Sequence, residues 1–125
     1  QSPDRLRNGW KLRRAARQRT SLTRWWDWLS VKPDGSITLD VRAVLETDDG
    51  ELIYTFYPGR MILTPEMFAM DRSERTEVDP ANYYFRTLPT YETGSEKYGW
   101  LNNIVAVGVG RITEKGVGFS VYEVK

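Results

Sequence analysis

An alternation of apolar and polar residues over positions 36–47, interrupted at Val44, is the feature that most limits how this chain can fold. One face of the run carries Ile37, Leu39, Val41, Ala43 and Leu45. Side chains of a β-strand alternate between its two faces, so this pattern predicts a strand with one apolar face. The following Asp48-Asp49-Gly50 predicts a tight hairpin turn, and residues 52–57 predict the returning strand.

Short strand patterns separated by turn signals continue along the chain. Further strands are predicted at residues 25–31, 83–88, 100–111 and 117–124. Pro33 and Gly35 predict the turn before the alternating run, and Pro58-Gly59 is expected to end or bend the returning strand. Thr64 followed by Pro65 predicts one short helical turn. Many short strands with little helix indicate an all-β barrel or sandwich.

The charges divide the chain into two parts. Residues 1–24 hold eight basic residues and one acidic residue, whereas residues 25–125 hold ten basic and sixteen acidic residues. We therefore expect a basic N-terminal arm, residues 1–24, and a β-barrel domain, residues 25–125. The arm is expected to be solvated or loosely docked. Nucleic-acid binding is disfavoured, because no aromatic-interleaved reader motif accompanies the charge.

The chain contains neither histidine nor cysteine. Both common ligands of zinc and other transition metals are thereby missing, and no glycine-rich turn opens a helix to hold a phosphate. We expect no metal and no other cofactor. No apolar run reaches the roughly 20 residues of a membrane helix, and the first residues lack the apolar core of a secretory signal. The expected location is the cytoplasm, without membrane contact.

Asp40 and Arg42 are the first candidate site residues, because they share one face of the alternating strand. In one interpretation they form a solvated polar face with local ion pairs. In the other they lie in a barrel lumen, where Arg42 binds an anionic or oxygenated ligand group and Asp40 orients it or acts as a base. Tyr84 and Arg86 form a similar pair on another strand. They are either a surface arginine stacked on a tyrosine or an inward-pointing pair in which Arg86 binds an anionic or oxygenated ligand.

Two more carboxylates are candidates for acid–base work. Glu92 follows a proline bend, where a side chain is easily re-aimed, although capping of the nearby loop explains it equally well. Asp27 lies among three tryptophans, and burial there would favour a proton donor. The remaining ligand-binding candidates are Tyr54, Trp100 and Asn102.

An ordered series of segments resembles the family known as domain of unknown function 3237, or uncharacterised protein family UPF 0311. The segments are Asp27-Trp28, Pro33-Asp34-Gly35, Leu39–Arg42, Thr47–Gly50, Tyr83–Thr87, Tyr91–Gly94, Tyr98–Asn102 and Val121–Val124. The resemblance implies a lipocalin-like antiparallel barrel and supplies no agreed activity. The family shows the same Asp-x-Arg arrangement as Asp40 and Arg42, which favours their placement in the lumen.

Three functions remain open on the sequence alone. The chain is expected to be a small-molecule-binding barrel for an apolar or aromatic ligand that carries an anionic or oxygenated group. The alternatives are a cofactor-free isomerase, cyclase or hydratase in the same cavity, and a structural or oligomeric protein with a filled barrel. Family members usually have more strand-forming sequence before the Asp-Trp element, so an open sheet edge here predicts a homo-oligomer, with a dimer expected.

Overall fold

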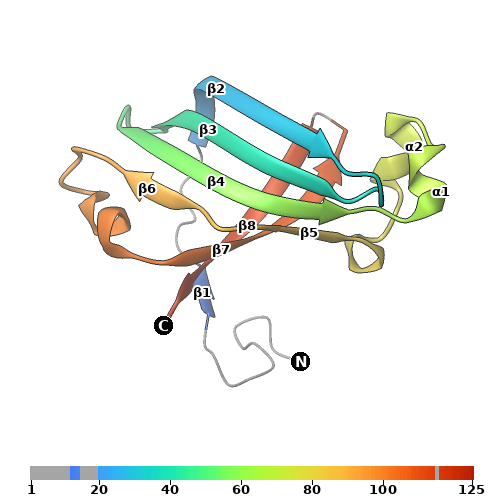
Figure 1. Ribbon diagram of the computed structural model, residues 1–125. Helices are drawn as coiled ribbons and strands as arrows, with labels where there is room; N and C mark the ends of the chain where they lie inside the picture. Colours follow the sequence, from blue (N-terminus) through green and yellow to red (C-terminus); the bar gives the residue numbers. More distant parts are fainter. Residues whose placement is uncertain (1–11, 15–19, 115) are drawn as a thin grey trace.

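The computed structural model describes residues 12–14, 20–114 and 116–125, with side chains described from Trp26 onward. One antiparallel sheet of eight strands dominates the structure (Figure 1). The strands are β1 (Leu12–Arg14), β2 (Thr20–Val31), β3 (Ile37–Thr47), β4 (Leu52–Ile62), β5 (Tyr84–Thr87), β6 (Thr90–Glu92), β7 (Ala106–Thr113) and β8 (Gly116–Val124). Their order across the sheet is β1-β8-β7-β5-β4-β3-β2, and β6 pairs with β4.

The sheet curls into a half-barrel. In Figure 1, β2, β3 and β4 run side by side while β7 and β8 cross beneath them. The two edge strands, β1 and β2, follow one another in the chain and are linked by residues 15–19 alone. A link of that length spans at most about 20 Å, so Arg14 and Thr20 must lie near each other. The all-β, antiparallel, barrel-like fold that the sequence predicts is confirmed.

The basic arm is only partly described. Residues 1–11 and 15–19 lie outside the described residues, and the remainder contributes β1 and the first part of β2. Strand β2 therefore begins at Thr20, five residues before the strand predicted from the sequence. It starts there because β3 is long enough to provide partners as far as Thr47, which is opposite Thr20.

The alternation in β3 separates the two faces of the sheet as predicted. Leu39, Val41 and Ala43 are 5%, 6% and 0% exposed, whereas Asp40 and Arg42 between them are exposed. We call the face that carries the buried set the concave face, because the sheet curls around it. The opposite face is the outer face. Every strand paired with β3 inherits this division through its register.

Strand β4 continues through Pro58-Gly59 instead of ending there. The Pro58 carbonyl accepts a hydrogen bond from the Leu88 amide at 2.9 Å, so the chain beyond β5 holds the strand at this point. A Cβ on Gly59 would lie 2.6 Å from the Arg86 carbonyl oxygen. Glycine is needed because the two backbones approach so closely.

Two apolar clusters occupy the two ends of the concave face. The first contains Ile37, Leu39, Met67, Tyr83 and Phe85, beside the helices; the second contains Ile53, Tyr98 and Leu101, beside η2 (Gly99–Asn103). Along β4, Thr55 and Tyr57 lie between Ile53 of the second cluster and Met61, which packs on the first. The middle of the concave face is thus its most polar part.

Short helices close one end of the sheet. Helix α1 (Pro65–Phe68) begins after Thr64, as predicted, and buries Met67. Helix α2 (Arg72–Thr76) was not predicted, and η1 (Pro80–Asn82) precedes β5. Asp71 and Glu74 form a capping box at the start of α2. That Asp-x-x-Glu spacing was the sequence signal for this helix.

Glycines in β7 make room for side chains of β5. Gly108 faces the Thr87 side chain, and a Cβ on Gly110 would lie 2.6 Å from the Phe85 ring. Phe85 is 2% exposed and meets the Phe119 ring of β8 edge to face, with centroids 5.3 Å apart. The smooth face of β7 is therefore required for packing between β5 and β8.

We expect Gly110→Ala to lower the free energy of unfolding by about 1–3 kcal/mol, because the new methyl group overpacks the Phe85 ring. Urea denaturation measures the change. Gly94→Ala is the matched control, since no atom lies within 4 Å of that Cβ position. Equal stability of the two variants would show that the Phe85 contact does not demand glycine.

Asp49 ties the β3–β4 turn to the loop before η2. Its carboxylate accepts hydrogen bonds from the Lys97 ammonium at 2.6 Å, from the Tyr98 hydroxyl at 3.2 Å and from the Thr47 hydroxyl. The hydrogen bonds from Lys97 and Thr47 lower the pKa of Asp49 to about 2. Asp49 therefore does more than form the turn for which the sequence predicts it.

Replacing Lys97 should raise the pKa of Asp49 toward its ordinary value of 3.8. Because the folded-state value is the lower one, the stabilising contribution is present above pH 3.8 and disappears as the pH falls through about 2. An NMR titration of the Asp49 carboxyl carbon in Lys97→Gln measures the shift. Lys32→Gln, which removes a lysine elsewhere, should leave this titration unchanged.

Candidate functional site

Asp27 and Tyr57 lie in one row across the concave face. Asp27 is opposite Val41 in the β2–β3 pair, and Val41 is opposite Tyr57 in the β3–β4 pair. Opposite residues of antiparallel strands point to the same face, and neighbouring strands lie about 4.8 Å apart. The backbones of Asp27 and Tyr57 are therefore roughly 10 Å apart, with the small space above Val41 between them.

Tyr91 extends this row toward β6. It is opposite Thr55, which precedes Tyr57 by two residues on the same face of β4. The Thr55 hydroxyl donates to the Thr90 carbonyl at 3.0 Å and holds β6 against β4. The Tyr57 ring meets the Phe119 ring of β8 with centroids 5.3 Å apart. We call Asp27, Tyr57 and Tyr91 the concave polar row.

The electrostatics link the three members of the concave polar row. Burial raises the pKa of Tyr57, and the Asp27 carboxylate raises it further. Burial raises the pKa of Tyr91 to about 12, with a smaller contribution from Tyr57. Both phenols consequently remain protonated at physiological pH and can donate a hydrogen bond. A carboxylate and two neutral phenols therefore share the concave face.

The predicted pair of Asp40 and Arg42 lies on the other side of the sheet. Their side chains are 51% and 54% exposed, and the Arg42 Nε lies 3.8 Å from an Asp40 oxygen. The Arg42 guanidinium also lies 4.5 Å from the Phe56 ring centre and 3.4 Å from the Tyr54 hydroxyl oxygen. The solvated polar face, one of the two sequence interpretations, describes this arrangement.

Tyr84, Arg86 and Glu92 are on the outer face too. Arg86 lies 5.1 Å from the Tyr84 ring centre and donates to the Phe85 carbonyl, while exposed Glu92 is opposite Tyr54. The expected interior grouping of Arg42 with these residues does not form. The physical reason is the strand register. The apolar side chains of β3 pack on the concave face, so the polar side chains that alternate with them, and their partners on neighbouring strands, point to the outer face.

Trp100 and Asn102 belong to η2 at one end of the sheet. Trp100 is 40% exposed. Asn102 accepts a hydrogen bond from the Thr93 amide at 2.8 Å and donates one to the Thr93 carbonyl at 3.0 Å. Asn102 therefore fastens the end of β6 to η2, and its amide is engaged by the backbone.

Of the nine residues singled out from sequence, Asp27 alone joins the concave polar row. Asp27 is exposed, because β2 ends the described sheet, so the burial among tryptophans that would favour a proton donor is not observed. Tyr57 and Tyr91 were missed. The sequence contained a partial indication for Tyr57, because it is separated from Ile53 and Thr55 by even numbers of residues and therefore lies on the same face of β4. The pairing of β6 with β4, which brings Tyr91 beside Thr55, has no local signature in the sequence.

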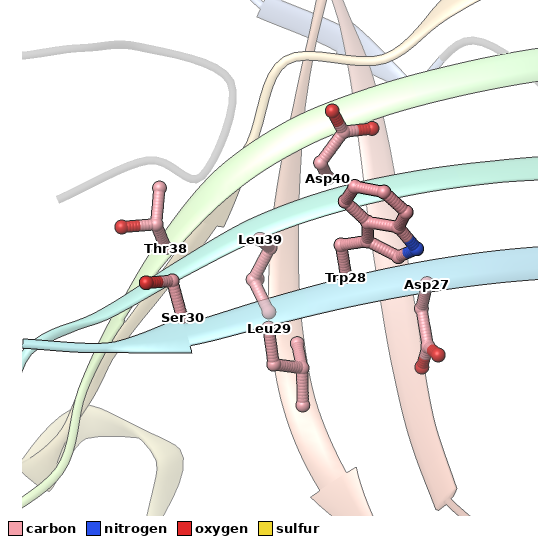
Figure 2. A pocket seen from close by; sticks show the side chains of 7 residues that line it. All are labelled: Asp27, Trp28, Leu29, Ser30, Thr38, Leu39 and Asp40. Carbon is pink, nitrogen blue, oxygen red and sulfur yellow. The ribbon is translucent and has the colours of Figure 1, made fainter.

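A hollow of about 430 Å³ adjoins the β2–β3 ribbon (Figure 2). Its concave lining is Asp27, Leu29 and Leu39, and its outer lining is Trp28, Ser30, Thr38 and Asp40. Figure 2 shows the Asp27 and Leu29 side chains directed away from those of Trp28 and Asp40. The lining therefore includes residues from both faces of the ribbon, and the hollow is open instead of an enclosed chamber on the concave face.

Among residues 12–14, 20–114 and 116–125, no group of three acidic side chains is arranged to hold a metal ion. Within the same residues, no helix has the length and apolar character needed to cross a membrane.

The fold and the concave polar row define an antiparallel β-barrel-like protein with a polar centre on its inner face. Residues 22–124 match the family described as Protein of unknown function (DUF3237). The chain belongs to this family, and the resemblance noted in its sequence is confirmed.

Similar proteins carry the same family name. A curated UPF0311 protein of Clostridium acetobutylicum is 42% identical over 77 residues, which are 62% of this chain and 48% of that protein. A UPF0311 protein of Bradyrhizobium diazoefficiens is 36% identical over 60% of this chain and 49% of its own length. The matches thus span about half the length of these curated relatives.

Solved structures share the fold. A protein of unknown function from Clostridium acetobutylicum has a TM-score of 0.70 and 32% identity, over 88% of this chain and 72% of that one. A protein from Acinetobacter baumannii, described as β-barrel like, has a TM-score of 0.66 and 30% identity, over 99% of this chain and 82% of that one.

Replacing Tyr91 should change how stability responds to alkali. The folded state disfavours the Tyr91 phenolate, so this contribution is complete below pH 10 and is lost as the pH rises through about 12. Tyr91→Phe should therefore reduce the loss of stability in this range, measured by urea denaturation at successive pH values. The exposed Tyr84→Phe is the matched control, and an identical response in both variants would contradict the burial of Tyr91.

Proposed function

We propose that this protein binds a small apolar or aromatic molecule on its concave face, held at one end by the concave polar row. The observation that supports the proposal most is the placement of Asp27, Tyr57 and Tyr91 on one face of the sheet, which also carries two apolar clusters. Ligand pockets are commonly apolar surfaces with a few converging polar groups that fix orientation.

The charges favour a neutral ligand over an anion. On the concave sides of β2 to β6, Asp27 is the one charged side chain among residues described from Trp26 onward. Arg42 and Arg86, which were expected to bind an anionic group, face the outside. A ligand hydroxyl can donate to Asp27 and accept from a phenol, whereas a ligand carboxylate would be repelled by Asp27.

The same groups support a second candidate, a cofactor-free isomerase or related enzyme. Asp27 would accept a proton from the bound substrate, and the protonated Tyr57 would donate a hydrogen bond to the oxyanion that forms. The placement of a carboxylate on the same face as a phenol whose pKa is raised by burial favours this candidate. It shares the ligand site of the first proposal and needs no metal or nucleotide.

A pair of matched probes tests the binding proposal. Naphthol is a neutral aromatic alcohol, and naphthalenesulfonate is an anion of similar size. Calorimetric titration should show naphthol binding about tenfold more tightly, a difference of about 1.4 kcal/mol. Asp27→Asn should remove most of this preference, because the substitution abolishes the repulsion while keeping a hydrogen-bond acceptor.

Tyr57→Phe should weaken naphthol binding several-fold through the loss of one hydrogen bond, worth about 1 kcal/mol. Tyr84→Phe, on the outer face, should leave the affinity unchanged. Tighter binding of the sulfonate than of naphthol, or equal effects of the two tyrosine substitutions, would contradict a concave site of this character.

A further inference from the structure

Strand β2 has a free edge that is unusually long and apolar. It runs from Thr20 to Val31 and pairs with β3 on one side, while no described strand pairs with its other side. Exposed apolar side chains stand on both of its faces. Trp26 and Trp28 are 53% and 78% exposed on the outer face, and Leu29 and Val31 are 59% and 63% exposed on the concave face.

Strand β2 has few of the usual protections of a sheet edge. Proteins normally block exposed edges with proline, lysine, bulges or very short strands. Between Thr20 and Val31 there is no proline and no lysine, and the one irregularity lies near the beginning of the strand, between Leu22 and Arg24. From Trp26 to Val31 the unpaired backbone groups form a template for another strand, and Asp27 is the only charge.

We propose that two copies of this chain pair antiparallel through their β2 edges, and that this pairing completes the concave pocket. The completion of the pocket rests on the proposed function. The β2 strand of a second copy can pair with the unpaired backbone groups of this edge. It also brings apolar neighbours to both faces, because directly opposite residues point to the same face. A two-fold axis through a residue of β2 pairs positions of equal parity, so the outer side chains of one copy adjoin those of the other, and the concave side chains do the same.

Asp27 limits the position of the axis. An axis through Asp27 would place two carboxylates opposite each other, which destabilises a strand pair. An axis through Trp26 sets Asp27 opposite Trp25, and an axis through Trp28 sets it opposite Leu29. Both arrangements also bring a tryptophan against its own copy, and such aromatic pairs stabilise adjoining strands.

The exposed apolar area is sufficient for a dimer. The accessible parts of Trp26, Trp28, Leu29 and Val31 amount to roughly 500 Å² in one copy. Two copies would bury about 1,000 Å², which is where specific interfaces begin, before any backbone is counted.

The hollow at β2 connects this interface to the ligand site. Residues 27–30 of its lining belong to the strand that a partner would adjoin, and Asp27 among them is a member of the concave polar row (Figure 2). Asp27 and Leu29 therefore lie at the uncovered edge of the concave face. The partner's strand would cover this edge and remove water from around the Asp27 carboxylate.

Sedimentation analysis with two lysine variants tests the pairing. Trp28→Lys puts a charge on the β2 edge, whereas Tyr84→Lys makes a comparable change on an exposed aromatic of the same outer face, in β5. We expect dimers for the unmodified chain and for Tyr84→Lys, and monomers for Trp28→Lys. A monomeric unmodified chain, or a Trp28→Lys variant that stays dimeric, would overturn the proposal.

Single cysteines test the geometry, because the chain has none of its own. A residue on the two-fold axis meets its own copy at a Cβ separation of about 5 Å, which is close enough for a disulfide after a small adjustment. Trp26→Cys or Trp28→Cys should form a linked dimer on mild oxidation, and Tyr84→Cys should not. Linkage through position 84 alone would place the interface elsewhere and refute pairing through β2.

Naphthol titration separates this inference from the proposed function. Monomeric Trp28→Lys should bind naphthol about tenfold more weakly, although Trp28 itself faces away from the concave side. Unchanged affinity in that monomer would refute completion of the pocket by the partner and leave the binding function standing. A dimeric unmodified chain that does not bind naphthol would instead refute the proposed function and leave the pairing intact.

Discussion

The apolar side of β3 packs into the interior of the curled sheet, and the placement of most other side chains follows from that burial. Leu39, Val41 and Ala43 lose nearly all their contact with water, and a shift of one residue would turn every one of them outward. The register with β2 and β4 is therefore strongly determined. It carries Asp27 and Tyr57 to the concave face and Arg42 to the outer face.

The sequence was sufficient for the parts of the fold that depend on local patterns. The alternation in β3, the hairpin at Gly50 and the helix after Thr64 were all predicted and are observed. The continuation of β4 through Pro58 was not, because it depends on a hydrogen bond from Leu88, thirty residues further along. Helix α2 had a local signal in Asp71 and Glu74, outweighed by the high charge of that segment.

The candidate site was less predictable than the fold. The alternation in β3 predicts two different faces but does not indicate which of them lies inside the curled sheet. The resemblance in the Asp-x-Arg arrangement favoured the polar face as the inner one. Burial decides otherwise, because a single curled sheet must put its apolar side chains inside. Tyr57 and Tyr91 meet only through the β4–β6 pairing, and a contact between such distant segments has no local pattern to reveal it.

The pairing of β1 with β8 has a consequence for how the chain folds. Leu12 lies opposite Val124, so residues more than a hundred positions apart in the sequence are direct partners in neighbouring strands. Closing so large a loop costs entropy that is recovered only when the intervening strands are in place. On the ribosome, β1 must therefore wait for β8 to emerge. Once β8 has emerged, it remains a second open edge until β1 pairs with it, and open edges are where incompletely folded chains are exposed to pairing with the wrong partner.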